Sequence, residues 1–250
     1  MAGDSFNRYR GGKDLPDKFP DRFEGGKDPS DKFPDRYKGG NEPRIDPADD
    51  FVDRVGYPDI YTNRFLNEKG NLEKSINRFE GENAYLSNMF PLEVGIKTPD
   101  GIVVGSAEQL YLPARLVMPE ARMVVMMAKD GKSAKKLLGS LERSGSPVRE
   151  DWDDSTKISV MRAAVLAKFI LNPELAERLL NTGDTEIIEG NNWNDRFWGV
   201  SPPPPNPNAQ GRNWLGKILM ETRDTLRDPH HEVDVESLVA ETFPNPNRIK

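Results

Sequence analysis

NNWNDRFWGVSPPPPNPNAQGRNWLG, residues 191–216, is the stretch around which the rest of the chain is organised. It contains three of the four tryptophans, one acidic residue and a run of four prolines, with no periodic apolar pattern, which predicts a long irregular loop. Because such a loop loses much conformational entropy when it orders, we expect it to carry function. Its end leads into a closing amphipathic helix whose inward residues are Leu215, Ile218, Leu219 and Leu226.

The composition limits the chemistry that this loop can support. The chain has 250 residues, 36% of them apolar, and a net charge of −6. This is enough for one ordinary domain with polar tails, and the acidic balance argues against broad, non-specific nucleic-acid binding. There is no cysteine, and His230 and His231 are the two histidines, which argues against thiol, serine–histidine and transition-metal chemistry. Carboxylates, lysine and tyrosine remain as acid–base candidates, and no metal or cofactor is expected.

No stretch of the sequence reaches the roughly 18 apolar residues of a membrane span, and no apolar signal core stands at the N-terminus. We therefore expect a cytoplasmic protein that does not enter a membrane.

An internal repeat occupies the first 60 residues. DLPDKFPDRFEGGK begins at Asp14, and DPSDKFPDRYKGGN follows it at Asp28, so the period is 14 residues. Each unit has too few apolar side chains to offset the chain entropy of folding, which predicts a poorly ordered tail. The alternative is a short linear motif that binds a protein partner through its arginine and aromatic residues.

Short elements follow from Ile76 onward. Two β-type runs, 92–96 and 102–104, flank TPDG and predict a hairpin. Ser106 is a helix cap with Gln109 as its capping-box partner, which puts Glu108 in the first turn, where the helix dipole favours the charged carboxylate. Glu108 is either a functional residue or simply a helix-start carboxylate. Pro113 is expected to kink or shorten this helix.

The remaining helices are predicted from apolar periodicity and from Pro and Gly breaks. Residues 119–143 are predicted to form two helices that break at Gly131, with MVVMMA (123–128) as a buried face. The apolar periodicity from Ile158 to Ile170 predicts the longest helix, with Trp152 at its entrance as a packing residue or a ligand platform. A helix from Pro173 to Leu180 and a short strand, TEIIEG, come next, and a short helix is expected near 235–241.

Five stretches in order resemble the NADAR (YbiA-like) domain family. They are INRFEGENAYLSNMFP, the SAEQ helix start, VREDWDDSTKISVMRAAVLAKFILNPELAERLLNTGD, IIEGNNWNDRFWG and GRNWLGKILMETRDTLR. The resemblance implies an α+β, mostly helical single domain with a small β-hairpin or sheet at residues 76–228. An N-terminal tail, 1–75, and a C-terminal tail, 229–250, flank it, both poorly ordered. It also implies N-glycosidase activity, on ADP-ribosylated guanine or on phosphorylated riboflavin-pathway intermediates.

The resemblance assigns site residues by position. Glu108 and Asp195 match the family's acidic residues and are the expected catalytic pair, although which is the acid is open. The expected substrate-binding residues are Phe79, Ser87, Asn88, Trp152, Trp198, Gly211, Arg212 and Asn213. Gln109, Leu112, Pro113, Arg115 and Ala209 depart from the family's usual residues.

The residue chemistry agrees with this assignment, because cleavage of a nucleosidic C–N bond needs an anion or base near the sugar and a proton for the departing nitrogen. Trp152 and Trp198 offer flat faces for a base. Backbone amides of the glycine loop, with Arg212 or Lys217, are predicted to hold a phosphate, unless the loop is only a helix cap.

The favoured reading is an N-glycosidase that removes ADP-ribose from a modified guanine, so the expected partner is a nucleotide-type small molecule or an ADP-ribosylated nucleic-acid base. The alternatives are cleavage of riboflavin intermediates, a non-catalytic module that binds ADP-ribose or a nucleotide, and an interaction protein that acts through its repeats.

Overall fold

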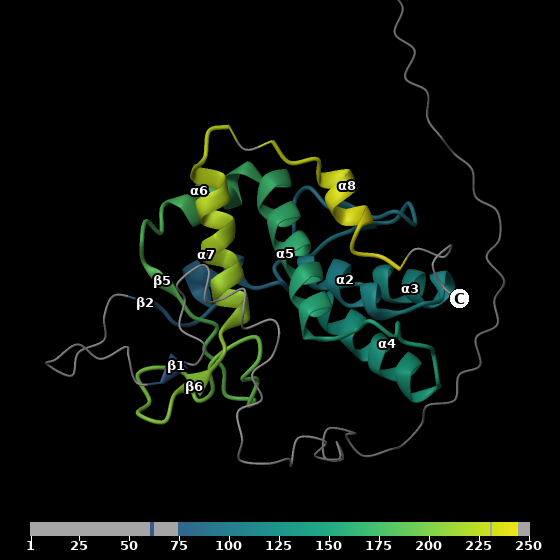
Figure 1. Cartoon of the computed structure of the whole chain (residues 1–250), viewed down its shortest axis with the longest axis horizontal. Helices are drawn as coiled ribbons and strands as arrows, with labels where there is room; N and C mark the ends of the chain where they lie inside the picture. Colours follow the sequence, from purple (N-terminus) through teal and green to yellow (C-terminus); the bar gives the residue numbers. More distant parts are fainter. Residues whose placement is uncertain (1–60, 63–74, 231, 245–250) are drawn as a thin grey trace, which may run out of the picture. The chain divides into compact units, whose positions relative to one another are not determined.

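Residues 61–62, 75–230 and 232–244 are described by the computed structural model. The chain divides into two units, Met1–Arg44 and Ile45–Lys250, and every described residue belongs to the second. The 14-residue repeats at positions 1–60 lie outside the described residues. The described part is α+β and mostly helical, as the sequence predicts (Figure 1).

Helix α5 (Asp154–Leu171) is the element on which α2, α6, α7 and α8 pack. It begins where Asp153 caps it by accepting the Thr156 N–H at 2.8 Å, and it ends at Asn172, before Pro173. Figure 1 shows it between α7 and the group formed by α2, α3 and α4. The other helices are α2 (Ala107–Tyr111), α3 (Pro119–Met126), α4 (Gly131–Arg143), α6 (Pro173–Leu180), α7 (Trp214–Arg227) and α8 (Val235–Ala240).

The strands are all two residues long and pair into three separate ribbons. The predicted hairpin is confirmed: β3 (Ile96–Lys97) and β4 (Val103–Val104) are antiparallel. Strand β5 (Glu186–Ile187), predicted within TEIIEG, pairs in parallel with β2 (Ser75–Ile76). Strand β1 (Tyr61–Thr62) lies in the segment predicted to be a tail, yet it pairs with β6 (Gln210–Gly211) at the end of the long loop.

Two local predictions about the region after the hairpin have different outcomes. Pro113 shortens the helix as predicted, because α2 stops at Tyr111 and a 3-10 turn, η3 (Pro113–Arg115), follows. A second 3-10 turn, η2 (Gly81–Leu86), precedes the hairpin. The prediction that MVVMMA forms a buried face is wrong. Val125 and Met126 are buried, but Met123, Val124 and Met127 are exposed, because α3 packs on its neighbours with one side only.

One main hydrophobic core contains residues from most of the described helices. The long helix buries Ile158, Met161, Val165 and Phe169 as predicted, and it also buries Lys168 completely. Helix α8, in the segment predicted to be the C-terminal tail, packs on α5 and adds Val239 and Phe243 to the core. Within the described ranges, no helix combines the length and the apolar character needed to cross a membrane.

Candidate active site

Glu108 lies in the first turn of α2, where the sequence predicts it. Ser106 caps the helix by accepting the Gln109 N–H at 3.3 Å, so half of the capping box is present. The Gln109 side chain instead donates to the Met126 and Ala128 carbonyl oxygens, at 3.3 and 2.7 Å. Burial raises the pKa of Glu108, and it is the largest effect on this carboxyl group.

The segment before the hairpin contacts the start of α2, where Glu108 lies. The Glu108 N–H donates to the Asn88 carbonyl oxygen at 2.9 Å, and the buried Asn88 side chain donates to Met161 Sδ at 3.0 Å. Lys168 Nζ donates to the Ser87 carbonyl oxygen at 2.9 Å. Phe79, from the same motif, packs on the core and is partly buried. The backbone carbonyl oxygens of Ser87 and Asn88 thus tie this segment to α5 and α2, respectively.

Asp195 organises the turn that precedes the aromatic residues of the long loop. Its Oδ1 accepts the Phe197 N–H at 3.1 Å and the Trp198 N–H at 2.9 Å. The Asn191 side chain holds the Asp195 backbone from both sides, accepting from its N–H at 3.1 Å and donating to its carbonyl oxygen at 2.7 Å. One carboxylate oxygen of Asp195 is thus committed to the turn, and this fixes the position of the other.

A third acid, Glu189, joins the two that the sequence predicts. It lies two residues after the end of β5, and burial, followed by the charges of Asp195 and Glu108, raises its pKa to about 8. Lys135 on α4 opposes this rise, and it also acts on Glu108. Three acidic side chains from separate segments therefore lie within electrostatic range of one another, and Lys135 acts on both glutamates.

Four aromatic rings form a continuous row beside these acids. The Tyr111 ring lies 5.7 Å from Trp152 and 5.5 Å from Trp198, and Trp198 lies 4.8 Å from Phe197. Glu108 and Asp195 are both near enough to Tyr111 to raise its pKa, after burial, which is the larger cause. The structure thus places the predicted Trp152 and Trp198 in one row, and Tyr111, which the sequence analysis missed, between them.

Cations stand at both ends of this aromatic row. The Arg115 guanidinium carbon lies 5.8 Å from the Trp152 ring, and Arg212 lies 5.8 Å from the Phe197 ring. Arg212 is within 3.5 Å of Asp154, and its side chain is 30% exposed. Partly exposed guanidinium groups beside flat rings suit a ligand that joins a base to phosphates.

The glycine loop before α7 has a different role from the predicted one. The backbone amides of residues 212–215 donate to the carbonyl oxygens of Arg196, Gly199, Phe197 and Trp198, respectively. The prediction that these amides hold a phosphate is wrong, because they are used inside the fold. Asn213, fully buried, accepts the Glu189 N–H and donates to the Ile187 carbonyl oxygen, both at 2.9 Å.

Two other residues of this loop also serve packing. A Cβ at Gly211 would overlap the Gly199 carbonyl oxygen, so the close backbone approach requires glycine there. Lys217, the other predicted phosphate contact, is fully buried with its Nζ 4.7 Å from the Trp214 ring centre. Arg212 is thus the residue of the predicted phosphate site whose side chain still reaches the surface.

The proline-rich part of the loop forms a closed side branch. The Ser201 N–H donates to the Gln210 carbonyl oxygen at 3.0 Å, which joins the two ends of the branch. Residues 205–208, at its tip, are exposed. The base of the branch is packed on the domain, because Pro203 and Pro204 are buried and the Asn77 side chain donates to the Pro204 carbonyl oxygen at 3.2 Å.

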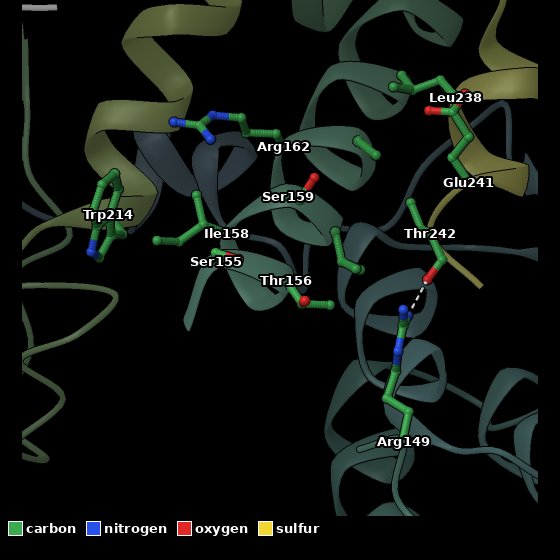
Figure 2. A pocket seen from close by; sticks show the side chains of 12 residues that line it. Arg149, Ser155, Thr156, Ile158, Ser159, Arg162, Trp214, Leu238, Glu241 and Thr242 are labelled. Carbon is green, nitrogen blue, oxygen red and sulfur yellow. Dashed lines mark hydrogen bonds between the residues drawn. The ribbon is translucent and has the colours of Figure 1, made fainter. Parts of the chain in front are cut away.

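Two cavities lie away from the acidic cluster. One, of about 500 Å³, runs along α5 between Trp214 and α8 and includes Arg149, Ser159 and Arg162 (Figure 2). The other, of about 880 Å³, is lined by the chain around Asn77 and the end of α6. In the first, Arg149 already donates to the Thr242 carbonyl oxygen, at 2.9 Å, and Arg162 pairs with Glu221 at 2.8 Å. Neither cavity includes Glu108, Glu189 or Asp195.

Across the described ranges, no three histidine, aspartate or glutamate side chains are grouped closely enough to hold a metal ion. Asp195 and Glu108 are thus near enough to Glu189 to raise its pKa, but the three acids do not form a coordination shell.

Comparison with known proteins agrees with the motifs. The chain is 33% identical over 144 residues to a riboflavin biosynthesis protein of Vibrio vulnificus, a match that covers 58% of this chain and 36% of that protein. It is 42% identical over 81 residues to an N-glycosidase of Nostoc punctiforme, covering 32% of this chain and 47% of that protein. The chain thus spans less than half the length of these curated relatives.

One solved structure is similar as well. The NMR structure of the Escherichia coli protein YbiA matches with a TM-score of 0.49 and 25% identity, covering 68% of this chain and all of that one.

The family comparison covers the acidic cluster, the aromatic row and the glycine loop together. The NADAR domain matches residues 76–227, which is more than half of the chain and includes every described residue discussed at this site. The chain therefore belongs to the NADAR domain family.

Proposed function

We propose that this chain is an N-glycosidase that hydrolyses the C–N bond between a ribose and a nucleobase. The observation that carries the proposal is the gathering of Glu108, Glu189 and Asp195 beside a row of aromatic rings. Relatives named as N-glycosidases support the reaction class. The substrate we favour is an ADP-ribosylated guanine base, because it would present a base to the rings and two phosphates to the flanking arginines.

The reaction passes through an oxocarbenium-like state at the ribose C1′ carbon. A carboxylate near C1′ stabilises the positive charge, and a carboxylate that accepts a proton from water directs the water to C1′. Glu108 and Asp195 carry these two roles in the proposal. Trp152 and Trp198 hold the base, and Arg115 and Arg212 attract the phosphates.

The departures from the family pattern bear on whether the domain is catalytic. Gln109, where the family usually has histidine, is buried and bonds to two carbonyl oxygens of the segment after α3. A residue used in this way affects the scaffold more than the reacting atoms. This observation supports an enzyme over a non-catalytic binding module.

A phosphorylated riboflavin-pathway intermediate is the second candidate substrate, because two relatives are named for that pathway. Two relatives, from Vibrio vulnificus and Zea mays, are named as riboflavin biosynthesis proteins. A phosphorylated ribosylamino-pyrimidine contains the same kind of C–N bond, one base for the rings and one phosphate for Arg212.

The experiment incubates the purified protein with an ADP-ribosylated guanine oligonucleotide and, separately, with the phosphoribosylamino-pyrimidine, and identifies the products by mass spectrometry. We expect free ADP-ribose and unmodified guanine from the first substrate. Cleavage of the pyrimidine alone would transfer the assignment to riboflavin intermediates. Binding of either compound with no cleavage at any pH from 5 to 9 would refute the enzyme and leave the binding module.

Variants test the acids in the same assay. Glu108→Gln and Asp195→Asn are expected to lower kcat at least about 100-fold, a typical contribution of a positioned acid or base. Asparagine keeps an oxygen that can accept the Phe197 and Trp198 amides, so a folded Asp195→Asn protein isolates the chemistry from the turn. Circular dichroism of each variant supplies the folding control.

A further inference from the structure

The backbone of Glu189 is hydrogen-bonded through both its N–H and its carbonyl oxygen. Its N–H donates to Asn213 Oδ1 at 2.9 Å, and its carbonyl oxygen accepts the Val200 N–H, also at 2.9 Å. A Cβ at Gly199 would overlap that same carbonyl oxygen, so the two backbones touch with no space between them. The start of α7 and the loop therefore clamp the Glu189 backbone from two sides.

The carboxyl group of Glu189 lies in surroundings that favour its neutral form. Within the described ranges, its Oε2 is buried and has no hydrogen-bond partner. The charged groups that act on it are Asp195 from the loop, Glu108 from α2 and Lys135 from α4. Burial and the two carboxylates raise the pKa of Glu189 to about 8, and Lys135 only partly offsets them.

The carboxyl groups of the other two acids have different surroundings. Asp195 Oδ1 accepts the Phe197 and Trp198 N–H groups, at 3.1 and 2.9 Å. For Glu108, the attraction of Lys135 is the strongest effect on the pKa after burial, whereas for Glu189 it is the repulsion by Asp195. Of these three acids, Glu189 is the one with a buried carboxyl oxygen that no described residue bonds.

We propose that Glu189 is the general acid of the reaction and donates its carboxyl proton to the departing nitrogen. The inference rests on the proposed function. As the C1′–N bond breaks, its electron pair moves to the nitrogen, which takes the Glu189 proton. Water then adds to C1′ and gives a proton to the carboxylate cluster, which restores the acid. One water is consumed, and the products are a ribose with a C1′ hydroxyl and a free base bearing a new N–H.

The test compares Glu189→Gln with the wild type on whichever substrate the wild type cleaves. Glutamine keeps the size and polarity of the side chain but has no proton to give at any pH. We expect kcat to fall about 100-fold or more. The wild-type rate should decrease above about pH 8, where Glu189 loses its proton, and this alkaline decrease should be absent in the residual activity of the variant. Glu177→Gln, an exposed glutamate on α6, is the matched control and should retain wild-type rates.

A second readout does not depend on turnover. Carbon-13 NMR of glutamate carboxyl groups, with the Glu189 signal assigned by its loss in Glu189→Gln, follows the titration directly. We expect a midpoint near pH 8. Titration near the ordinary glutamate value, or a folded Glu189→Gln protein with kcat within threefold of Glu177→Gln, would overturn the inference while the N-glycosidase assignment stands. A wild type that cleaves neither substrate would refute the proposed function, and the role of Glu189 with it.

Discussion

Replacing Lys168 by methionine is predicted to make the domain more stable at neutral pH. Lys168 is fully buried on α5, and burial lowers its pKa from 10.5 to about 7. Since one pKa unit corresponds to about 1.4 kcal/mol, the ammonium form opposes folding by roughly 4–5 kcal/mol near pH 7 and below. Methionine fills a similar volume without charge but loses the 2.9 Å bond to the Ser87 carbonyl oxygen, worth about 1 kcal/mol. The net gain expected at pH 7 is therefore about 3 kcal/mol.

The pH dependence is the sharper part of this prediction. Between pH 7 and 10.5, the unfolded chain keeps the lysine proton that the folded chain has released. The free energy of unfolding therefore rises with pH in this window, with a slope of up to about 1.4 kcal/mol per pH unit from this one group. The variant lacks that contribution, so its advantage over the wild type should shrink to about zero near pH 10.

Urea denaturation at pH 7, 8, 9 and 10, followed by circular dichroism, measures the difference directly. Lys132→Met, an exposed lysine on α4, serves as the control and should run parallel to the wild type. If the Lys168→Met and wild-type stabilities also ran parallel across this range, the buried amine would carry the same charge in both states, and the reasoning would fail.

Three further predictions concern packing and binding. Arg122→Met leaves Asp100 without its two 2.9 Å contacts at a nearly buried site, and should lower the free energy of unfolding by about 3–5 kcal/mol in urea titrations; a loss below 1 kcal/mol would contradict it. Gly216→Ala puts a Cβ into the Ile187 carbonyl oxygen and should lower the melting temperature by several degrees. The control is Gly139→Ala on α4, which faces only the end of the Arg143 side chain and should not lower it. Equal melting temperatures would show that the close approach of Gly216 to the Ile187 carbonyl oxygen is not needed. Trp198→Leu removes one ring of the aromatic row and should raise KM about 5- to 150-fold, equivalent to roughly 1–3 kcal/mol of stacking, with kcat nearly unchanged. The control is Trp193→Leu, because Trp193 is 70% exposed and outside the row, and this variant should leave KM as it is. An unchanged KM for Trp198→Leu would remove the row from the binding site.

Much of the local structure was predictable because its signals are local. The hairpin follows from TPDG between apolar runs, and α5, α6 and α7 follow from periodicity and from Pro or Gly breaks. The end of α2 follows from Pro113. Each of these depends on residues within about one turn of the feature itself.

The site was only partly predictable, because its remaining parts come together through tertiary contacts. Glu189 follows Ile187 and Ile188 at the end of a short strand, and nothing near it in the sequence indicates that Glu108 and Asp195 will lie beside it. Tyr111 falls in the gap between Trp152 and Trp198 for the same reason. A resemblance that already assigned two acids gave no cause to look for a third.

Burial of polar groups was the other limit. A lysine such as Lys168 normally predicts an exposed position. Lys168 is nevertheless fully buried, because α5 packs against neighbouring helices on several sides. The sequence predicts that the backbone amides before α7 are free to bind an anion. In the folded loop, these amides donate instead to four carbonyl oxygens.

The two ends of the proline-rich branch are hydrogen-bonded to each other, so the number of residues at its tip can change. Since the Ser201 N–H meets the Gln210 carbonyl oxygen, both ends stay 3.0 Å apart at that bond however many residues lie between them. The chain can therefore lengthen or shorten at residues 205–208, whereas Pro203, Pro204 and Ala209 are buried and must keep their packing. For protein engineering, the exposed tip at 205–208 is the position at which to insert an affinity tag or a fluorescent reporter.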